Sequence, residues 1–256
     1  MEMTNAEYHA DPAVSKSHLD MVNRSPFHYK AHYIDKSIER IQTPTFLEGS
    51  LTHSMVLEPD KTDSEFVIAP KVDRRTKAGK EEYNAFMFEH SGKDIVAPDM
   101  WERAAAMTAS VNGHSEARKW LKNGVAESSH FWTDKATGLR CKCRPDWLTD
   151  DGVIVDLKTT ADASPAGFAK SVANFRYHVQ HSWYLDGISA EKFVFVCVEK
   201  TPPYAVAVYE LDAEAYAIGQ RMARYNLDQI AEGLETDIWT GYEGLNILSL
   251  PKWAKN

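Results

Sequence analysis

The sequence predicts an α/β domain in which a mixed central sheet is flanked by helices and preceded by an N-terminal helical layer. Three observations predict this class. Apolar residues recur at helical spacing through much of residues 1–124, the pattern changes to two-residue alternation over residues 125–158, and helices and strands then alternate up to residue 235. The 256 residues, 43% apolar and 26% charged, suffice for one large core and exclude disordered, collagen-like and coiled-coil chains.

The first 124 residues are expected to be mainly helical. Apolar residues follow a helical repeat over residues 15–33, which Ser25-Pro26 interrupts because proline is disfavoured inside a helix. A short strand is expected at residues 66–68, before the segment 71–80, which carries five basic residues and one acid in ten positions. The helices are expected at residues 15–33, 46–57, 81–89 and 98–122.

Beyond residue 124, two-residue alternation predicts three neighbouring strands. They are joined by short polar turns that end in Gly138 and Gly152, which favours an antiparallel meander. A long helix, two strands and a final helix should follow. The strands are expected at residues 125–133, 139–148, 153–158, 192–199 and 204–211, and the helices at residues 165–185 and 213–232.

The composition limits the classes of function. With 29 basic and 37 acidic residues, the net charge of −8 argues against a protein that coats DNA by bulk charge, but not against a nuclease with a local basic groove. Three cysteines are too few for a disulfide framework or a four-thiolate metal site. No apolar stretch approaches the roughly 20 residues of a spanning helix, and the N-terminus lacks signal-peptide features, so we expect a cytoplasmic protein without membrane contact.

Charged residues gather at the end of an apolar strand. Alternation places Asp156 and Lys158 on one face of this strand, where burying them is costly unless they pair or meet a cation. On the preceding strand, alternation places Asp146 on the same face as Lys142 and Arg144. The tight turn between the two strands could bring Asp146 and Asp156 close enough to share a cation.

Glu127, on the first of the three strands, is a further candidate oxygen ligand. Hard divalent cations such as Mg²⁺ prefer oxygen ligands, so carboxylates at one sheet edge fit this metal better than zinc. The alternative interpretation of Asp156 and Lys158 is a surface ion pair without catalytic function.

One motif in these strands resembles that of a known nuclease superfamily. Pro145-Asp146, followed by Asp156-Leu157-Lys158, resembles the P-D…(D/E)-x-K motif of the PD-(D/E)XK nucleases.

Three further segments indicate which branch and family of this superfamily the chain resembles. Gln180 and Tyr184 in the next helix resemble the Q-x-x-x-Y motif of the RecB-type branch, and their spacing puts them on one helix face. Residues 8–17 and 46–53 resemble the nuclease domain of exonuclease VIII, the RecE family. Together these matches cover most of the chain.

The RecE resemblance implies both a fold and an activity. The fold is a PD-(D/E)XK core at residues 125–235, with residues 1–124 as a helical elaboration of one exonuclease domain that spans residues 1–256. The activity is 5′-to-3′ digestion of linear double-stranded DNA with Mg²⁺, for which Mn²⁺ could substitute. The resemblance further implies a homo-oligomeric ring, a tetramer, that prepares 3′ single strands for a single-strand-annealing partner in recombination, in a phage or prophage setting.

The resemblance also implies a metal site. Two Mg²⁺ ions about 4 Å apart would activate water and stabilise charge during phosphodiester hydrolysis. Glu116 is an alternative to Glu127, because the spacing does not distinguish them, and His53 could instead support a ligand or contact DNA. The expected ligands are His53, Glu127, Asp146, Asp156 and the carbonyl of Leu157.

Other residues are expected to act on water or DNA. Lys158 would orient or help to activate the attacking water, and Gln180 and Tyr184 would face the active site or the DNA. A basic segment near residue 75 could contact phosphates, although a solvated loop explains it equally simply. The expected DNA contacts are Lys71, Arg74, Arg75, Lys77, Lys142 and Arg144.

Two other functions stay open. The motif specifies hydrolysis but not whether DNA enters by an end, so a PD-(D/E)XK endonuclease is one alternative. A non-catalytic DNA-binding adaptor that retained the fold is the other, and it need not bind a divalent cation.

Overall fold

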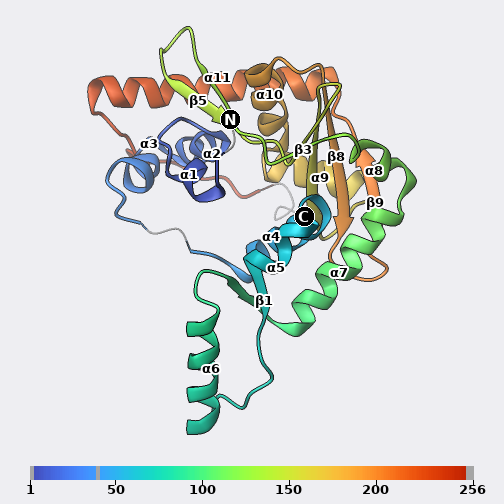
Figure 1. The fold of residues 1–256 in the computed structure, drawn as a ribbon. Coiled ribbons are helices and arrows are strands. Elements are labelled where there is room, and N and C mark those ends of the chain that lie inside the picture. The colour runs from blue at the N-terminus through green and yellow to red at the C-terminus, as the bar shows by residue number, and fades with distance from the viewer. Residues whose placement is uncertain (1–2, 39–40, 252–256) are drawn as a thin grey trace.

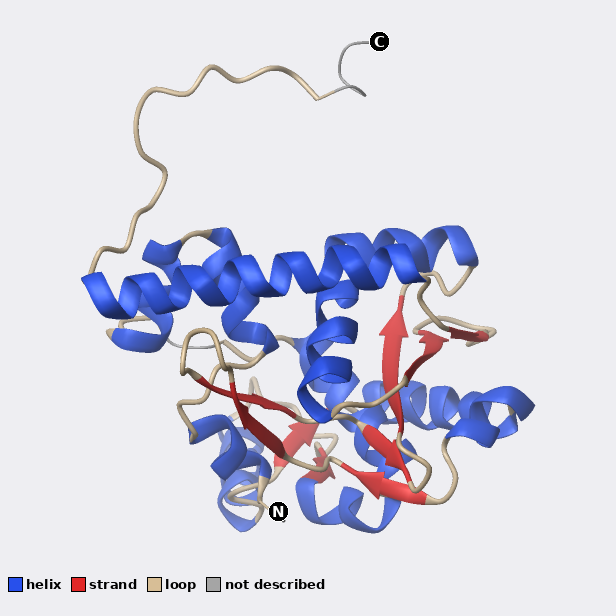
Figure 2. Cartoon of the chain, turned by 90° about the horizontal axis from the view of Figure 1, so that it is seen from above, coloured by secondary structure: helices blue, strands red, loops and turns tan. Residues whose placement is uncertain are grey.

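A five-stranded mixed sheet forms the centre of the computed structural model, which describes residues 3–38 and 41–251 (Figures 1 and 2). Its strand order is β3 (Gly124–Ala126), β6 (Trp147–Thr149), β7 (Val153–Thr160), β8 (Lys192–Glu199) and β9 (Val206–Tyr209). β7 and β8 run parallel, and the other neighbours run antiparallel. Two shorter pairs are present, antiparallel β4 (His130–Thr133) with β5 (Arg140–Cys143), and parallel β1 (Phe66–Ile68) with β2 (Asp94–Val96).

Helices cover both faces of this sheet, which confirms the predicted α/β class. The helices before the sheet are α1 (Asn5–Ala10), α2 (Lys16–Arg24), α3 (Pro26–Tyr29), the π-helical turn η1 (Lys30–Ile34), α4 (Pro44–Leu57), α5 (Pro59–Glu65), α6 (Lys77–Glu89), α7 (Pro98–Gly113) and α8 (Ser115–Trp120). Those after β7 are α9 (Pro165–Asn174), α10 (Tyr177–Ile188) and α11 (Ala213–Thr236). Within the described residues, no helix is both long and apolar enough to cross a membrane.

The alternation along β7 divides the core into two layers. Val155 and Leu157 face α4 and α7, where they pack with Leu51 and Met107. Ile154 lies on the opposite face, in the layer that α9 and α10 cover. Because β7 and β8 are parallel, the chain must cross over between them, and α9 and α10 make that crossover. The predicted faces of β7 are therefore confirmed, including the shared face of its acidic and basic residues.

Two of the predicted strands are each broken in two. Glu127 has a left-handed backbone, with φ of 52°, which ends β3 and leaves β4 to pair elsewhere. Pro145 lacks an N–H group and separates β5 from β6. The expected antiparallel pairings are present, but the prediction of two continuous strands is wrong. Both breaks occur next to the candidate metal ligands.

The predicted helix at residues 165–185 is also broken. Arg176 adopts a left-handed backbone with φ of 55° and divides α9 from α10. His114, which has an extended backbone, divides the predicted helix 98–122 into α7 and α8. Its side chain accepts a hydrogen bond from the amide of Ala117 and so caps α8. Residues 192–199 form a strand with the predicted bounds.

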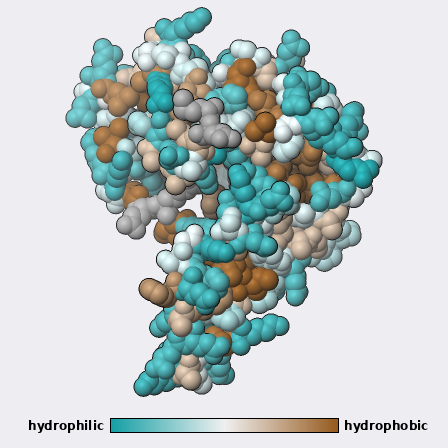
Figure 3. All heavy atoms as spheres, in the orientation of Figure 1, coloured by the Kyte–Doolittle hydropathy of each residue, from teal (hydrophilic) through white to brown (hydrophobic). Residues whose placement is uncertain are grey.

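The segment between β1 and β2 projects from the rest of the molecule (Figure 1). It contains α6 and the basic residues that precede it, and its surface is mostly hydrophilic on the side seen in Figure 3. Within α6 only Gly79 is buried. The sequence predicted this helix from residue 81, whereas it begins at Lys77, because Thr76 accepts a hydrogen bond from the amide of Gly79 and caps the helix.

Candidate active site

Three side chains that can bind a metal converge beside β7, the central strand of the sheet. His53 comes from α4, Glu127 from the residue after β3, and Asp146 from the residue before β6. One ligand atom from each lies within 4.8 Å of the others. Among the described residues this is the one such group of three or more histidine, cysteine, aspartate or glutamate side chains. The donor set suits a hard divalent cation.

The backbone fixes Asp146 against both neighbouring strands. Its carboxylate oxygen Oδ2 accepts a hydrogen bond of 2.8 Å from the amide of Leu157 and lies 3.4 Å from Nδ1 of His53. Its carbonyl accepts a hydrogen bond of 3.1 Å from the amide of Glu127. Because Pro145 interrupts the predicted strand, Asp146 lies between β5 and β6, and its carboxylate contacts the backbone of β7. The proposed contact of the Leu157 carbonyl with metal stays a prediction.

Asp156 and Lys158 lie beside this group, on the face of β7 that α10 covers. The Asp156 carboxylate is fully buried, forms an ion pair with the Lys158 ammonium and accepts a hydrogen bond of 2.5 Å from Nε2 of Gln180. The ammonium lies 4.8 Å from the centre of the Tyr177 ring. Oδ2 of Asp156 thus accepts the hydrogen bond from Gln180, whereas the buried Oδ1 has the ion pair with Lys158 but no hydrogen-bond donor among the described residues. The role of Asp156 as a metal ligand stays a prediction.

The charges of the site shift one another's pKa values. Burial and the neighbouring Asp146 raise the pKa of Glu127 to about 8, although the Arg144 guanidinium opposes this. Burial and Asp146 raise the pKa of Asp156 to about 6, against the attraction of Lys158. Burial alone would lower the pKa of Lys158, but the two aspartates raise it above its ordinary value. A bound divalent cation would therefore favour the ionised forms of both acids.

Gln180 and Tyr184 lie one turn apart on α10, as their spacing predicts. Gln180 reaches Asp156 directly, whereas the Tyr184 phenol is enclosed nearby, and burial raises its pKa well above the ordinary value. Sequence reasoning missed Tyr177, whose ring covers the Lys158 ammonium. Its position three residues before Gln180, on the same helix face, is a signal that could have found it.

The structure does not support phosphate contacts from the two basic residues predicted on the strand before Asp146. Lys142 is 2% exposed, and its ammonium donates hydrogen bonds to the carbonyls of Tyr8 and Asp11. Arg144 is held between Glu127 and the N-terminal backbone. The expectation for Lys142 is wrong, because residues 3–14 cover this face of β5, which strand alternation could not reveal.

The remaining basic residues lie on the projecting segment and are open to solvent. Arg75 pairs with Asp73 at 2.9 Å, and the Arg74 guanidinium lies 4.1 Å from the centre of the Tyr83 ring. Contact of this segment with DNA stays a prediction for Lys71, Arg74, Arg75 and Lys77.

The placement of Glu116 resolves one alternative. Its carboxylate accepts a hydrogen bond of 2.9 Å from Nε1 of Trp120 and lies 3.4 Å from the Lys119 ammonium, on the surface of α8. It is not part of the group with His53. The geometry therefore favours Glu127 as the additional carboxylate.

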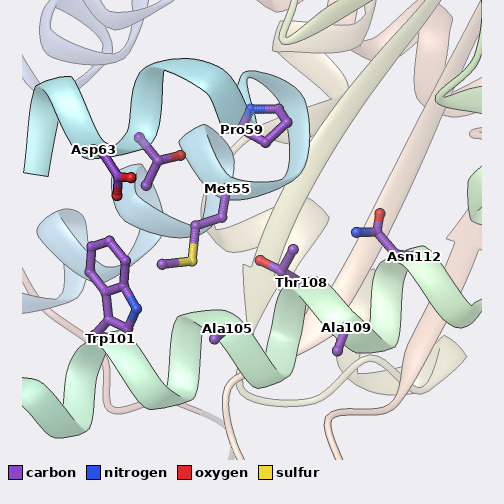
Figure 4. Close-up of a pocket in the computed structure, with 9 residues that line it drawn as sticks. Met55, Pro59, Asp63, Trp101, Ala105, Thr108, Ala109 and Asn112 are labelled. Atoms are coloured by element: carbon purple, nitrogen blue, oxygen red, sulfur yellow. The ribbon is translucent and has the colours of Figure 1, made fainter.

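A cavity of about 440 Å³ lies between α4, α5 and α7 (Figure 4). Its walls are mainly apolar. The lining residues are Met55, Pro59, Thr62, Asp63, Trp101, Ala105, Thr108, Ala109 and Asn112. None of the predicted catalytic or metal-binding residues lines it.

Comparison with known families agrees with the fold and the motif. Residues 15–248 match the model of a PDDEXK-like domain of unknown function, DUF3799. The chain belongs to this family. In the structure Asp146 directly precedes β6, and Asp156 and Lys158 lie on β7.

Solved structures also resemble this DUF3799 domain. The crystal structure of a "Putative exonuclease" from Eubacterium rectale has a TM-score of 0.70 and 15% identity, over 98% of this chain and 96% of that chain. At this identity the likeness shows a shared fold. The structure of SSO0001 has a TM-score of 0.32 and 16% identity, over 70% of this chain and 85% of that chain, and is too distant to bear on the site. No curated protein matches the chain.

Proposed function

We propose that this PDDEXK-like protein is a Mg²⁺-dependent exodeoxyribonuclease that digests linear double-stranded DNA from its ends. One observation carries the proposal: His53, Glu127 and Asp146 converge beside the buried pair of Asp156 and Lys158. Carboxylates can hold the divalent cations on which metal-assisted phosphodiester hydrolysis depends, and an adjacent ammonium can donate hydrogen bonds to the attacking water.

The residues of the chain divide the chemical tasks. His53, Glu127 and Asp146 would hold the cation, with Asp156 as a further ligand, and Mn²⁺ could replace Mg²⁺. A bound divalent cation lowers the pKa of water and stabilises charge on phosphoryl oxygens. Lys158 stays protonated because the nearby carboxylates raise its pKa, so its ammonium donates hydrogen bonds that orient the attacking water.

The polarity and setting of the reaction follow from the RecE resemblance. In this proposal, water attacks the phosphorus of the 5′-ended strand, the P–O3′ bond breaks, and a 5′-mononucleotide leaves. The remaining 3′ single strand would pass to a single-strand-annealing protein in recombination.

A ring of several copies is the assembly we propose for digestion from an end. The C-terminal segment supports an association between copies, because Leu245, Ile247 and Leu248 are at least 90% exposed. Burying such side chains is worth about 1.5–3 kcal/mol each. Light scattering of the whole chain and of a chain ending at residue 241 tests this, and a monomer in both cases would contradict it.

The decisive experiment uses DNA with and without ends. Linear duplex labelled at either the 5′ or the 3′ end, and a covalently closed circle, are incubated with Mg²⁺ or EDTA. Early release of the 5′ label as a mononucleotide, with the circle intact, is expected. Lys158→Ala should be inactive, and Lys135→Ala, in the exposed β4–β5 turn, should behave like the wild type.

Other outcomes would select the alternatives. Cleavage of the closed circle would indicate an endonuclease. Mg²⁺-independent binding without cleavage of any substrate would indicate a DNA-binding adaptor.

A further inference from the structure

Residues 3–14 form a strap across the outer face of β5, which we call the N-terminal strap. Alternate residues of this strand and its continuation, Arg140, Lys142 and Arg144, all point toward it. Arg140 pairs with the Asp11 carboxylate at 2.8 Å, and Lys142 donates to two strap carbonyls. The amide of Val14 donates to the carbonyl of Arg140 at 2.9 Å, which extends the backbone contact to the end of the strap.

Arg144 connects the strap to the candidate metal site. Its Nη2 donates a hydrogen bond of 2.9 Å to the carbonyl of Met3, and its Nη1 lies 3.4 Å from the carbonyl of Thr4. On its other side, Nε donates a hydrogen bond of 2.7 Å to the carbonyl of Glu127 and lies 3.2 Å from Oε2 of the same residue. The guanidinium also lies 5.3 Å from the centre of the Tyr8 ring. The Arg144 side chain is only 10% exposed.

These contacts matter because Glu127 has an unfavourable backbone. A non-glycine residue with φ of 52° needs partners on both sides to hold it. The Glu127 amide donates to the carbonyl of Asp146, and its carbonyl accepts from Arg144. The planar guanidinium therefore fixes the main chain and the carboxylate of Glu127 together, which a flexible ammonium could not do equally well.

We propose that Arg144, clamped by the N-terminal strap, is a positioning residue that sets the Glu127 carboxylate for binding a divalent cation. The inference rests on the proposed function, because it takes Glu127 as a metal ligand. It assigns to Arg144 a role other than the DNA contact expected from the sequence. The strap itself precedes residue 15, where the match to the family model begins.

The test measures metal binding apart from activity. In the whole chain without DNA, the Mn²⁺ concentration that gives half of the maximal rise in Tm is compared among variants. Arg144→Lys keeps the charge but loses the planar donor pair, so this concentration should rise about tenfold or more, as is typical when a partner of a metal ligand is lost. Arg140→Lys is the matched control, because Arg140 holds the same strap through Asp11. It should change this concentration less than about twofold.

DNA affinity in EDTA separates positioning from phosphate contact. Fluorescence anisotropy with a linear duplex should give both variants an affinity within about twofold of the wild type. Weaker DNA binding by Arg144→Lys, with unchanged Mn²⁺ dependence, would overturn the proposal in favour of a phosphate contact. Unchanged values in both measurements would overturn it as well.

A second variant keeps the test independent of the folding of Arg144→Lys. Deletion of residues 2–5 removes both carbonyls that hold the guanidinium and leaves Arg144 in place. It should raise the half-maximal Mn²⁺ concentration several-fold, and no change would contradict the clamping by the strap. A wild-type protein that neither cleaves DNA nor gains stability from Mn²⁺ would overturn the proposed function. A wild type that does gain stability from Mn²⁺, with the same half-maximal Mn²⁺ concentration in both variants, would overturn this inference alone.

Discussion

Replacement of Glu127 by glutamine should stabilise the metal-free protein while it removes a metal ligand. Burial of the Glu127 carboxylate and the negative charge of Asp146 together raise the pKa of Glu127 from the ordinary 4.5 to about 8. A raised pKa means that the folded state holds the proton more tightly than the unfolded chain. The contribution of protonated Glu127 to stability is therefore complete below about pH 4.5 and is lost as the pH rises to about 8.

The size of the effect follows from this shift. At pH 7 the stabilisation has been lost over about 2.5 pH units above the unfolded pKa of 4.5. Each unit corresponds to about 1.4 kcal/mol, which gives about 3–4 kcal/mol. Glutamine resembles the protonated acid and carries no titrating group. In EDTA at pH 7, the free energy of unfolding of Glu127→Gln should therefore be about 3–4 kcal/mol higher than that of the wild type, and the two values should converge near pH 4.5.

Urea denaturation in EDTA at several pH values measures this difference. Glu116→Gln is the matched control, because Glu116 lies on the surface of α8 and should show no comparable pH-dependent gain. With Mn²⁺ the order should reverse, because the wild type gains stability from the bound ion and Glu127→Gln gains less. A glutamine variant that is less stable than the wild type in EDTA at pH 7, or a difference that does not change with pH, would refute the reasoning.

Three further substitutions test other parts of the molecule. Gln180→Leu removes the hydrogen bond to the buried Asp156 carboxylate and should lower the rate of DNA cleavage about 10–100-fold, while circular dichroism shows an intact fold. An unchanged rate would exclude a role for this hydrogen bond in cleavage. Lys142→Met leaves two carbonyls of the N-terminal strap without a donor, so it should lower the free energy of unfolding by about 1–3 kcal/mol, whereas DNA affinity in EDTA stays constant. A selective loss of DNA affinity would instead support the expectation that Lys142 contacts phosphate. Phe195→Ala opens a cavity beneath α9 and α10 and should lower the free energy of unfolding, measured by urea denaturation, by about 3–5 kcal/mol. A decrease below about 1 kcal/mol would show that the side chains of this layer repack around the cavity.

Much of the fold was predictable because local patterns agree with the tertiary structure. The buried strand β8 has the predicted bounds, since a continuous apolar run flanked by charged residues has few alternatives. Two of the errors occur where single residues take left-handed backbones, at Glu127 and Arg176. Neither residue type favours that conformation, so the contacts around them, which come from distant parts of the chain, impose it.

The candidate site was predictable in part for a similar reason. Alternation along β7 placed Asp156 and Lys158 on one face, and helical spacing placed Gln180 and Tyr184 together. Strand alternation could not show that the Lys142 side chain is buried, because the residue that covers it, Tyr8, lies more than a hundred residues earlier in the chain.

The sequence by itself determined the class of fold, the motif and the kind of cation that its carboxylates suit, since strand alternation, helix spacing and ligand chemistry are local properties. Only the tertiary structure decided which residues meet. It brought His53 to Asp146, selected Glu127 over Glu116, and turned Arg144 from the expected DNA surface toward a carboxylate. Those choices depend on how α4, the N-terminal strap and the broken strands pack on β7, and packing between distant segments leaves no periodic signal in the sequence.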